Sequence, residues 1–380
     1  MAPQLLNRSS RSTSRASKGQ AMFNPSRLAL ARRRRRLTSK AFADLIGMSP
    51  VTVTRLEKGY NEPEPETVEA IAKALRFPRE FFYGDDIDEL TKEAASFRSL
   101  TSMTAKEREA ALAAGALAYL LADWVADRFN LPAPDVLDLS FERSPKNAAR
   151  MLRQHWKLGE QPISNMVKLL EAKGVRLFSL SENTRNVDAF SCWRNGTPFV
   201  FLNTFKSSEH SRFDAAHELG HLVLHKHGGP QQGRKAEMEA NEFASSFLMP
   251  EADVRSKIPR HISLDGIVSA KKRWGVSVAA LAYRLHKLGT LSDWHYQGMC
   301  IEMNRRGYRE NEPNGLPREE SVVWRKVLTE LWTDKVTKAH VAEQLHLPSE
   351  EIENLVFGLA GYPQQRTLNA LQSKPQLRLI

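Results

Sequence analysis

The sequence predicts a mainly helical α+β protein with one small sheet, and three observations carry this prediction. Near the N-terminus, short segments of helical periodicity are separated by Gly47 and Gly59, which is typical of a compact all-helical unit. In the centre, the apolar run Pro198–Asn203 reads as a buried strand, and a segment with apolar residues three and four apart follows it. Beyond about residue 291, further helical patterns alternate with short polar stretches.

The N-terminal unit contains two short helices joined by a tight turn. The first of the pair is expected over Thr38–Ile46 and stops at Gly47. Ser49 is an N-cap followed by a proline at the first helical position, so a second helix begins there and ends at Gly59. This arrangement is the helix-turn-helix signature. An earlier helix over 27–36 and a later one over 67–75 are expected to complete the unit.

Positive charge is concentrated at the front of the chain. The net formal charge is +11, from 55 Lys and Arg against 44 Asp and Glu, and residues 1–40 carry eleven basic residues and no acidic one. Such a segment favours a polyanion, with nucleic acid the leading candidate, over a solvated tail or a targeting peptide. Residues 1–22 lack a long apolar run, so we expect a disordered basic tail and not a secretory signal.

The N-terminal unit resembles the phage-repressor-like (XRE) DNA-binding domains. The resemblance rests on Leu37, Thr38, Phe42, Ala43, Ile46, Gly47, Ser49, Val53, Leu56, Glu57, Gly59, Pro63 and the segment Thr67–Leu75. In such modules the second helix of the motif enters the major groove N-terminus first. The candidates for base contacts are therefore Ser49, Val51, Thr52 and Arg55, and those for phosphate contacts are Lys40 and the Arg32–Arg36 run. Double-stranded DNA is the expected partner, bound by a homodimer or a tandem arrangement, and protein contact is the alternative use of such a motif.

The most informative motif is the pentapeptide His217-Glu218-Leu219-Gly220-His221. Residues four apart lie on one face of a helix, about 6 Å along its axis, so both imidazoles can bind one metal ion with Glu218 beside it. The surrounding stripe is apolar, and Gly220 lets another element approach closely. A metal is favoured over two ordinary core histidines, because burying three polar groups without a partner is costly.

A catalytic metal also needs a third protein ligand and an open position. Glu237 is the candidate, because it opens a second helix three residues before Ala240 on that helix's buried side. Asn241, one turn further on, could orient a ligand.

The rival third ligand is His227, which has metzincin spacing from the second motif histidine. That motif also needs a glycine where this chain has Leu224. We therefore expect His225 and His227 to lie at a helix end, near its negative dipole end.

The central region resembles the ImmA/IrrE zinc metallopeptidases over roughly residues 145–290. The residues that carry the resemblance are Arg212 to His221, Glu237, Ala240, Asn241, Phe243, Ala244, Leu248, Met249 and Pro250, with Val187 to Phe190 and Phe199 to Asn203 upstream. The resemblance implies a zincin-like fold with Zn²⁺ on His217, His221 and Glu237, and with Glu218 as the catalytic base. The implied chemistry is peptide-bond hydrolysis by an activated water. A substrate strand could add to a sheet edge at 187–193 or at 198–203.

The remaining segments are expected to be helical connections. A packing helix is predicted over 106–129, with an uncharged stretch too short to span a bilayer, and two helices over 147–173 lead into a strand at 174–180. Helices near 320–332, 338–345 and 351–357 either pack on the core or form a second DNA-binding module or a substrate-recognition lobe. The last dozen residues look unstructured.

The expected organisation is a basic tail (1–22), an XRE-like helix-turn-helix domain (23–85), a helical linker (86–145), an ImmA/IrrE-like peptidase domain (146–290) and a helical C-terminal domain (291–380). With two cysteines, no signal segment and no membrane segment, the cytoplasm is the expected compartment. The leading hypothesis is a DNA-binding zinc endopeptidase that regulates transcription by cleaving a repressor. The alternatives are a protease toxin restrained by an antitoxin, and a DNA-binding regulator with a structural or sensory zinc.

Overall fold

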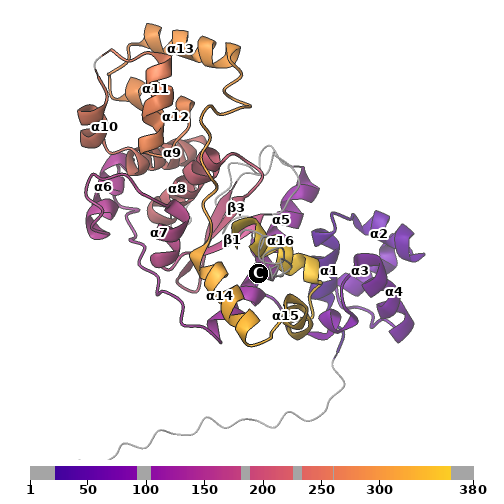
Figure 1. The fold of residues 1–380 in the computed structure, drawn as a ribbon. Coiled ribbons are helices and arrows are strands. Elements are labelled where there is room, and N and C mark those ends of the chain that lie inside the picture. The colour runs from indigo at the N-terminus through magenta and orange to yellow at the C-terminus, as the bar shows by residue number, and fades with distance from the viewer. Residues whose placement is uncertain (1–21, 92–103, 181–188, 226–232, 260, 361–380) are drawn as a thin grey trace, which may run out of the picture.

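The computed structural model describes residues 22–91, 104–180, 189–225, 233–259 and 261–360. It confirms the mainly helical α+β class: within those ranges sixteen α-helices surround one three-stranded sheet. Figure 1 shows the N-terminal helices at one end of the molecule, the sheet in the middle, and a helical lobe at the other end.

The N-terminal domain forms as its capping residues predict. It contains α1 (Pro25–Arg34), α2 (Ser39–Ile46), α3 (Pro50–Glu57), α4 (Pro65–Leu75) and the 3-10 segment η1 (Arg79–Tyr83). The Thr38 hydroxyl accepts the Ala41 N–H at the start of α2, and the Ser49 hydroxyl accepts the Thr52 N–H at the start of α3. Gly47 ends α2 in the left-handed region, with φ 69°, which glycine adopts without steric cost.

The sheet has the strand order β1 (Arg176–Leu180), β3 (Thr197–Asn203), β2 (Phe190–Arg194). β1 is parallel to β3, and β2 is antiparallel to it. Because β3 is paired on both sides, the expectation that 198–203 could supply a free edge is wrong. β2 lies at an edge of the sheet, whereas residues 187 and 188 of the other predicted edge lie outside the described residues.

The two faces of the sheet belong to different cores. Phe199 and Phe201 face α5 (Ala105–Ala126), where the Tyr119 ring meets Phe199 edge-on with centroids 4.9 Å apart. Val200 and Leu202 face the opposite way and join the core around α8 (Ser208–Leu224). This alternation is the period of two expected of a strand buried on both faces.

By length and apolar composition, the whole of α5, which is longer than its uncharged stretch, qualifies among the described segments as a helix that could cross a membrane. However, 78% of its most apolar stretch is buried inside the protein. This burial is what a packing helix of the core requires.

The rest of the central region is helical. α6 (Pro145–His155) and α7 (Met166–Ala172) precede the sheet, and α8 is followed by α9 (Arg234–Leu248). The lobe at the far end contains α10 (Glu251–Lys257), α11 (Leu264–Ala270), η3 (Lys271–Arg273), α12 (Val278–Lys287) and α13 (Asp293–Arg305). The predicted helices at 213–224 and 237–248 correspond to α8 and α9, which begin five and three residues earlier.

The C-terminal helices pack on the core, which supports the first of the alternatives given for them. They are α14 (Val322–Thr333), α15 (Lys338–Leu345) and α16 (Ser349–Ala360); in Figure 1, α16 lies beside the sheet on the side of the N-terminal domain, and α14 and α15 lie lower in the view. The Trp324 indole N–H donates to the Leu177 carbonyl of β1 at 2.7 Å. The β1 edge is therefore occupied by a C-terminal side chain.

Two carboxylates anchor the start of this C-terminal segment. Glu319 accepts the backbone N–H groups of Met166 and Val167 at the start of α7, and Glu171 of α7 accepts the N–H groups of Val322 and Val323 at the start of α14. Each helix thus has its unpaired N-terminal N–H groups satisfied by a carboxylate from the other segment. Burial raises the pKa of the Glu171 carboxyl, while the hydroxyl of Ser321 and these N–H groups act in the opposite direction.

Candidate metal centre and DNA-binding surface

The HExxH residues lie on α8, in the part of the helix that packs against α9. Gly220 permits this contact: a Cβ on Gly220 would lie 3.1 Å from a Phe243 ring carbon and 3.2 Å from the Ala240 Cα. Ala240 and Phe243 are both fully buried on α9, as its apolar pattern predicts. The close approach of the two helices brings Glu237 opposite the histidines.

Three predicted ligands converge on one point. His217 Nε2 and His221 Nε2 are 3.0 Å apart, and they lie 3.2 and 3.4 Å from the two oxygens of the Glu237 carboxylate. Ligands about 2.05 Å from a tetrahedral metal are separated by about 3.3 Å, so these three side chains have the spacing of a zinc site. In the described part of the chain, this is the group of His and carboxylate side chains close enough to hold a metal.

The chemistry of the donors also fits a cation. Glu237 Oε2 is buried and has no hydrogen-bond partner, although His217 Nε2 is near it. The carboxylate oxygen is buried beside imidazole nitrogens, but the geometry is not that of a hydrogen bond. This arrangement is expected where the two histidines and the glutamate all direct lone pairs at one shared ion. The alternative ligand His227 lies outside the described residues.

The neighbouring groups hold the predicted base and one ligand in place. Asn241 Oδ1 lies 3.1 Å from His217 Nδ1, which places Asn241 where it was expected to orient a ligand. Ser191 of β2 donates its hydroxyl to Glu218 Oε2 at 2.7 Å. The sheet edge is thereby tied directly to the predicted catalytic base.

Two opposing effects set the pKa values of the cluster: burial, which disfavours the charged forms, and the attraction between the histidines and the nearby carboxylates. Burial lowers the pKa of His221 to about 4, and the nearby His217 acts in the same direction against Glu237. Burial raises the pKa of Glu237, but the two histidines outweigh this effect and lower the pKa to about 2. For His217 burial acts downward, and Glu237, Glu218 and Asp214 outweigh it to raise its pKa. Glu237 is therefore ionised at neutral pH, and His221 is neutral, as metal ligands must be.

A pocket of about 480 Å³ opens beside the cluster. Its wall includes His217, Glu218 and Asn241, and it extends along the first half of α8 toward α12. The other lining residues are Ala189, Glu209, His210, Phe213, Asp214, Ser245, Ser277, Ala280 and Tyr283. The arrangement can place a polypeptide next to a metal and a carboxylate base.

Two parts of this site cannot be recognised from the sequence. Ser191 resembles any strand serine, and only the fold places it against Glu218. Lys271 is fully buried between Glu209 and Glu312, with its Nζ 2.9 Å from each carboxylate. This buried triad fixes the first turn of α8, yet Lys271 lies in a sequence that reads as a solvated basic run.

The candidate base contacts lie on the outer face of the N-terminal domain. Ser49, Val51 and Arg55 are exposed, and Val51 exposes 62% of its surface although it is apolar. Thr52 is half-buried, and its hydroxyl lies 2.8 Å from that of Ser49. Lys40 is exposed at the start of α2. The structure thus leaves this surface of α2 and α3 accessible.

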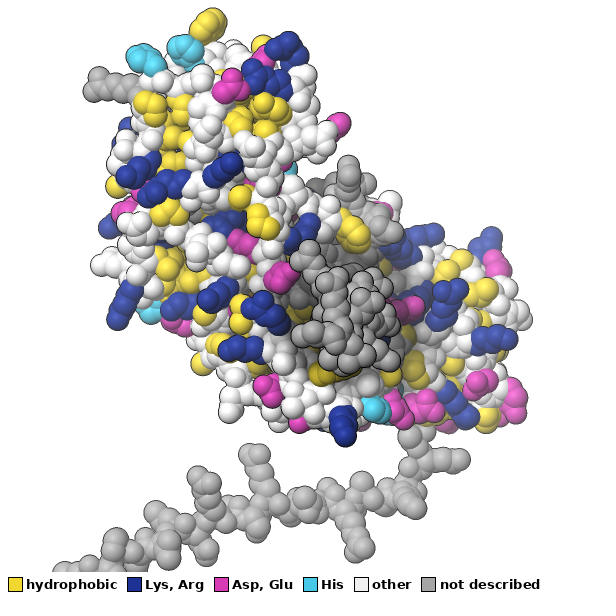
Figure 2. All heavy atoms as spheres, in the orientation of Figure 1, with side chains coloured by type: hydrophobic (Ala, Val, Ile, Leu, Met, Phe, Trp, Pro, Cys, Tyr) yellow, Lys and Arg dark blue, Asp and Glu magenta, His cyan; other side chains and the backbone are white. Residues whose placement is uncertain are grey.

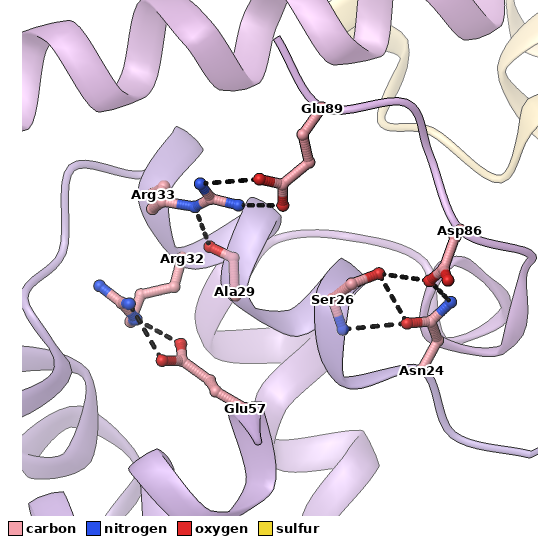
Figure 3. Close-up of polar contacts among 8 residues, drawn as sticks. All are labelled: Asn24, Ser26, Ala29, Arg32, Arg33, Glu57, Asp86 and Glu89. Carbon is pink, nitrogen blue, oxygen red and sulfur yellow. Dashed lines mark hydrogen bonds and ion pairs between the residues drawn. The ribbon is translucent and has the colours of Figure 1, made fainter. Parts of the chain in front are cut away.

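The first four members of the Arg32–Arg36 run, which the sequence assigns to phosphate contacts, form ion pairs within the protein. Arg32 pairs with Glu57 at the end of α3, and Arg33 pairs with Glu89, as Figure 3 shows. Arg34 and Arg35 pair with Glu351 of α16. These guanidinium groups form contacts within the protein, because the fold places carboxylates from distant parts of the chain next to α1.

Figure 2 shows how charge is distributed over this end of the molecule. Dark blue Lys and Arg side chains lie over its upper part, and magenta carboxylates gather along its lower border, near α4. Exposed Glu62, Glu64, Glu66 and Glu69 belong to the segment that leads into and through α4. A polyanion would therefore approach the α2–α3 side in preference to the α4 side.

The fold and site together define a protein with two functional parts: a helix-turn-helix unit, and a zincin-like unit in which an HExxH helix meets a second helix with a glutamate ligand. Residues 28–82 match the Helix-turn-helix family model, and residues 170–286 match the Peptidase M78 model, described as the IrrE N-terminal-like domain. A search of curated proteins finds no match to the chain. The chain thus joins a helix-turn-helix domain of DNA-binding type to a metallopeptidase-type domain of the IrrE class.

Proposed function

We propose that this protein is a DNA-binding zinc endopeptidase that regulates transcription by cleaving a repressor-type protein. The observation that carries the proposal is the convergence of His217, His221 and Glu237 beside Glu218, at the wall of an open pocket. A structural zinc site is closed by four protein ligands, whereas a catalytic site has three and an open position. Three ligands next to a base and a pocket favour catalysis over a structural zinc.

The proposed roles follow from the chemistry of each side chain. Zn²⁺ held by the three ligands would supply Lewis-acid activation of a water molecule and of the scissile carbonyl. Glu218 takes the proton of that water and passes it to the leaving amine. The Ser191 hydroxyl, at 2.7 Å, fixes the Glu218 carboxylate for this transfer.

The proposed substrate mode is addition of an extended segment to β2. The β1 edge is occupied by the Trp324 contact, and β3 is paired on both sides, which leaves β2 as the edge next to α8. A strand added there would run past Ser191 and therefore past the catalytic base.

The DNA-binding domain gives this chemistry a location. We assign Ser49, Val51, Thr52 and Arg55 to base contacts and Lys40 to a phosphate contact. Holding the peptidase at one locus raises its effective concentration near other proteins on the same DNA, of which repressors are the natural class. We also propose the five segments expected from the sequence, with the bounds given above, as the domain organisation of the protein.

The test compares cells that produce the parent protein with cells that produce Glu218→Gln, and maps new peptide termini across the proteome. We expect termini from a DNA-binding repressor with the parent protein and their loss with Glu218→Gln, while the purified variant keeps its zinc. A Glu218→Gln variant that complements fully in cells would contradict the proposal and would leave a regulator with a non-catalytic metal. A restrained toxin would instead show cleavage only after a neighbouring antitoxin is removed.

A further inference from the structure

The second metal-ligand histidine has a partner on each ring nitrogen. His221 Nε2 points to the cluster with His217 and Glu237, while His221 Nδ1 lies 3.0 Å from His225 Nδ1. His225 is the C-cap residue of α8, and its backbone N–H donates to the His221 carbonyl at 2.9 Å. The two rings are thus held one helical turn apart, with centroids 5.1 Å apart.

The contact continues to a carboxylate on the other helix. His225 Nε2 lies 3.0 Å from Glu239 Oε2, and Glu239 follows the ligand Glu237 by two positions on α9. The side chains of His225 and Glu239 are 17% and 23% exposed, so this link is shielded from most solvent. Among the described residues, Lys235 lies 3.7 Å from Glu239 and is 75% exposed, so it competes weakly for the carboxylate.

We propose that Glu239 and His225 form a positioning chain that orients the His221 ring for metal binding. This inference rests on the metal site of the proposed function. A metal ligand at Nε2 needs its lone pair there, so neutral His221 carries its proton on Nδ1 and donates it to His225 Nδ1. His225 then keeps its own proton on Nε2 and donates it to the Glu239 carboxylate. Every hydrogen bond runs in one direction, and each donor has one acceptor.

The positioning chain provides His221 with a hydrogen-bond acceptor at Nδ1, as Asn241 does for His217. The Asn241 amide oxygen accepts from His217 Nδ1, at 3.1 Å, and fixes that ring from α9. Carboxylates that accept from a ligand histidine, directly or through another group, fix its tautomer and raise its basicity. The two motif histidines are therefore both anchored to α9, the helix that also supplies Glu237.

The test measures metal affinity in the full-length protein, by competition of Zn²⁺ with a chelator and by the visible absorption spectrum after Co²⁺ loading. His225→Leu and Glu239→Ala should each weaken metal binding about 10- to 100-fold and alter the cobalt spectrum. His225→Asn retains an acceptor oxygen near the position of Nδ1 and should bind metal more tightly than His225→Leu. Glu242→Ala is the matched control, because Glu242 is exposed on the same helix.

The outcomes separate this inference from the proposed function. A parent protein that binds neither metal refutes the metal site itself. A parent that binds metal, with Glu239→Ala and His225→Leu within about threefold of its affinity and with unchanged spectra, overturns the positioning chain alone. Equal losses in His225→Asn and His225→Leu would also overturn it, because packing and not hydrogen bonding would then explain the effect. Glu239→Ala decides the matter even if His225→Leu fails to fold, since Glu239 is partly exposed on α9 and does not belong to the apolar core.

Discussion

The Arg34 guanidinium donates a hydrogen bond of 2.8 Å to the Glu351 carboxylate, although 317 positions separate the two residues in the chain. Glu351 is fully buried and also accepts from Arg35 Nη1 at 2.9 Å. Through this contact, α1 of the DNA-binding domain is joined to α16 of the C-terminal region (Figure 1).

The other end of α16 lies against the sheet. A Cβ on Gly358 would lie 2.2 Å from Ser179 Oγ and 2.5 Å from Thr204 Oγ1, so a larger residue at this position would require both hydroxyl groups to move. One helix therefore contacts both the DNA-binding domain and the sheet that carries Ser191. These buried contacts of α16 fix the position of the DNA-binding domain relative to the sheet.

Glu351→Gln should destabilise this junction. Replacing the buried Glu351 carboxylate removes the charge that Arg34 and Arg35 share, although Arg35 keeps its pair with the exposed Glu350, and breaking a buried ion pair costs about 3 kcal/mol. Hydrogen exchange should increase in α1 and α16, and the free energy of unfolding should fall. Glu353→Gln, on the same helix but in an exposed pair with Lys338, should change stability by less than about 1 kcal/mol. Equal effects of the two variants would refute a special role for Glu351.

Ser191→Ala should slow peptide cleavage without weakening metal binding. A hydrogen bond to a charged group contributes about 1.5–3 kcal/mol, so kcat/KM should fall about 10- to 100-fold when the Glu218 carboxylate loses this donor. The zinc affinity should stay at the parent value, because Ser191 contacts the base and no predicted ligand. Ser179→Ala on β1, whose hydroxyl meets Thr204, is the control and should retain activity. Parent-level kcat/KM in Ser191→Ala would exclude this role.

Arg55→Ala and Lys40→Ala should each weaken DNA binding and reduce the salt dependence of binding. Each lost phosphate contact lowers the slope of log K against log salt by about 1, and a base contact also changes sequence preference. The measurement is duplex affinity across a salt series. Lys272→Ala, exposed on the distant η3 segment, should leave the slope unchanged. Arg32→Ala should reduce stability instead, because Arg32 pairs with Glu57 inside the domain.

Asp253→Asn should reduce stability at neutral pH but not in acid. The Arg273 guanidinium, followed by the Trp274 indole N–H, lowers the pKa of the Asp253 carboxyl in the folded protein. A depressed carboxyl pKa stabilises the fold above the unfolded value of about 3.9, and this contribution is lost as the pH falls through the folded value.

At pH 7, Asp253→Asn should lower the free energy of unfolding by about 2 kcal/mol. Its thermal midpoint should therefore lie below that of the parent. The gap between the two proteins should narrow as the pH falls below about 4. Asp265→Asn, which is 75% exposed in its pair with Arg306, is the control. A gap that stays constant from pH 7 to acid would contradict the linkage.

The sequence alone determined the local elements and the residues of the candidate metal centre. Capping residues such as Thr38 and Ser49 act on neighbouring N–H groups, and the spacing of His217 and His221 is fixed by helix geometry, so both are readable without the fold. Glu237 was identifiable because its phase on an amphipathic helix sets the side on which it lies.

Only the tertiary structure decided which distant groups meet. The arginines of α1 read as a DNA-facing run, yet Glu89 and Glu351 return to them, and Lys271 becomes a buried cation between Glu209 and Glu312. Which strand is free was likewise set by pairing, since β2 and β3 are both apolar. The physical reason is that capping and periodicity act within one or two helical turns, whereas ion pairing and edge coverage depend on how separate elements pack.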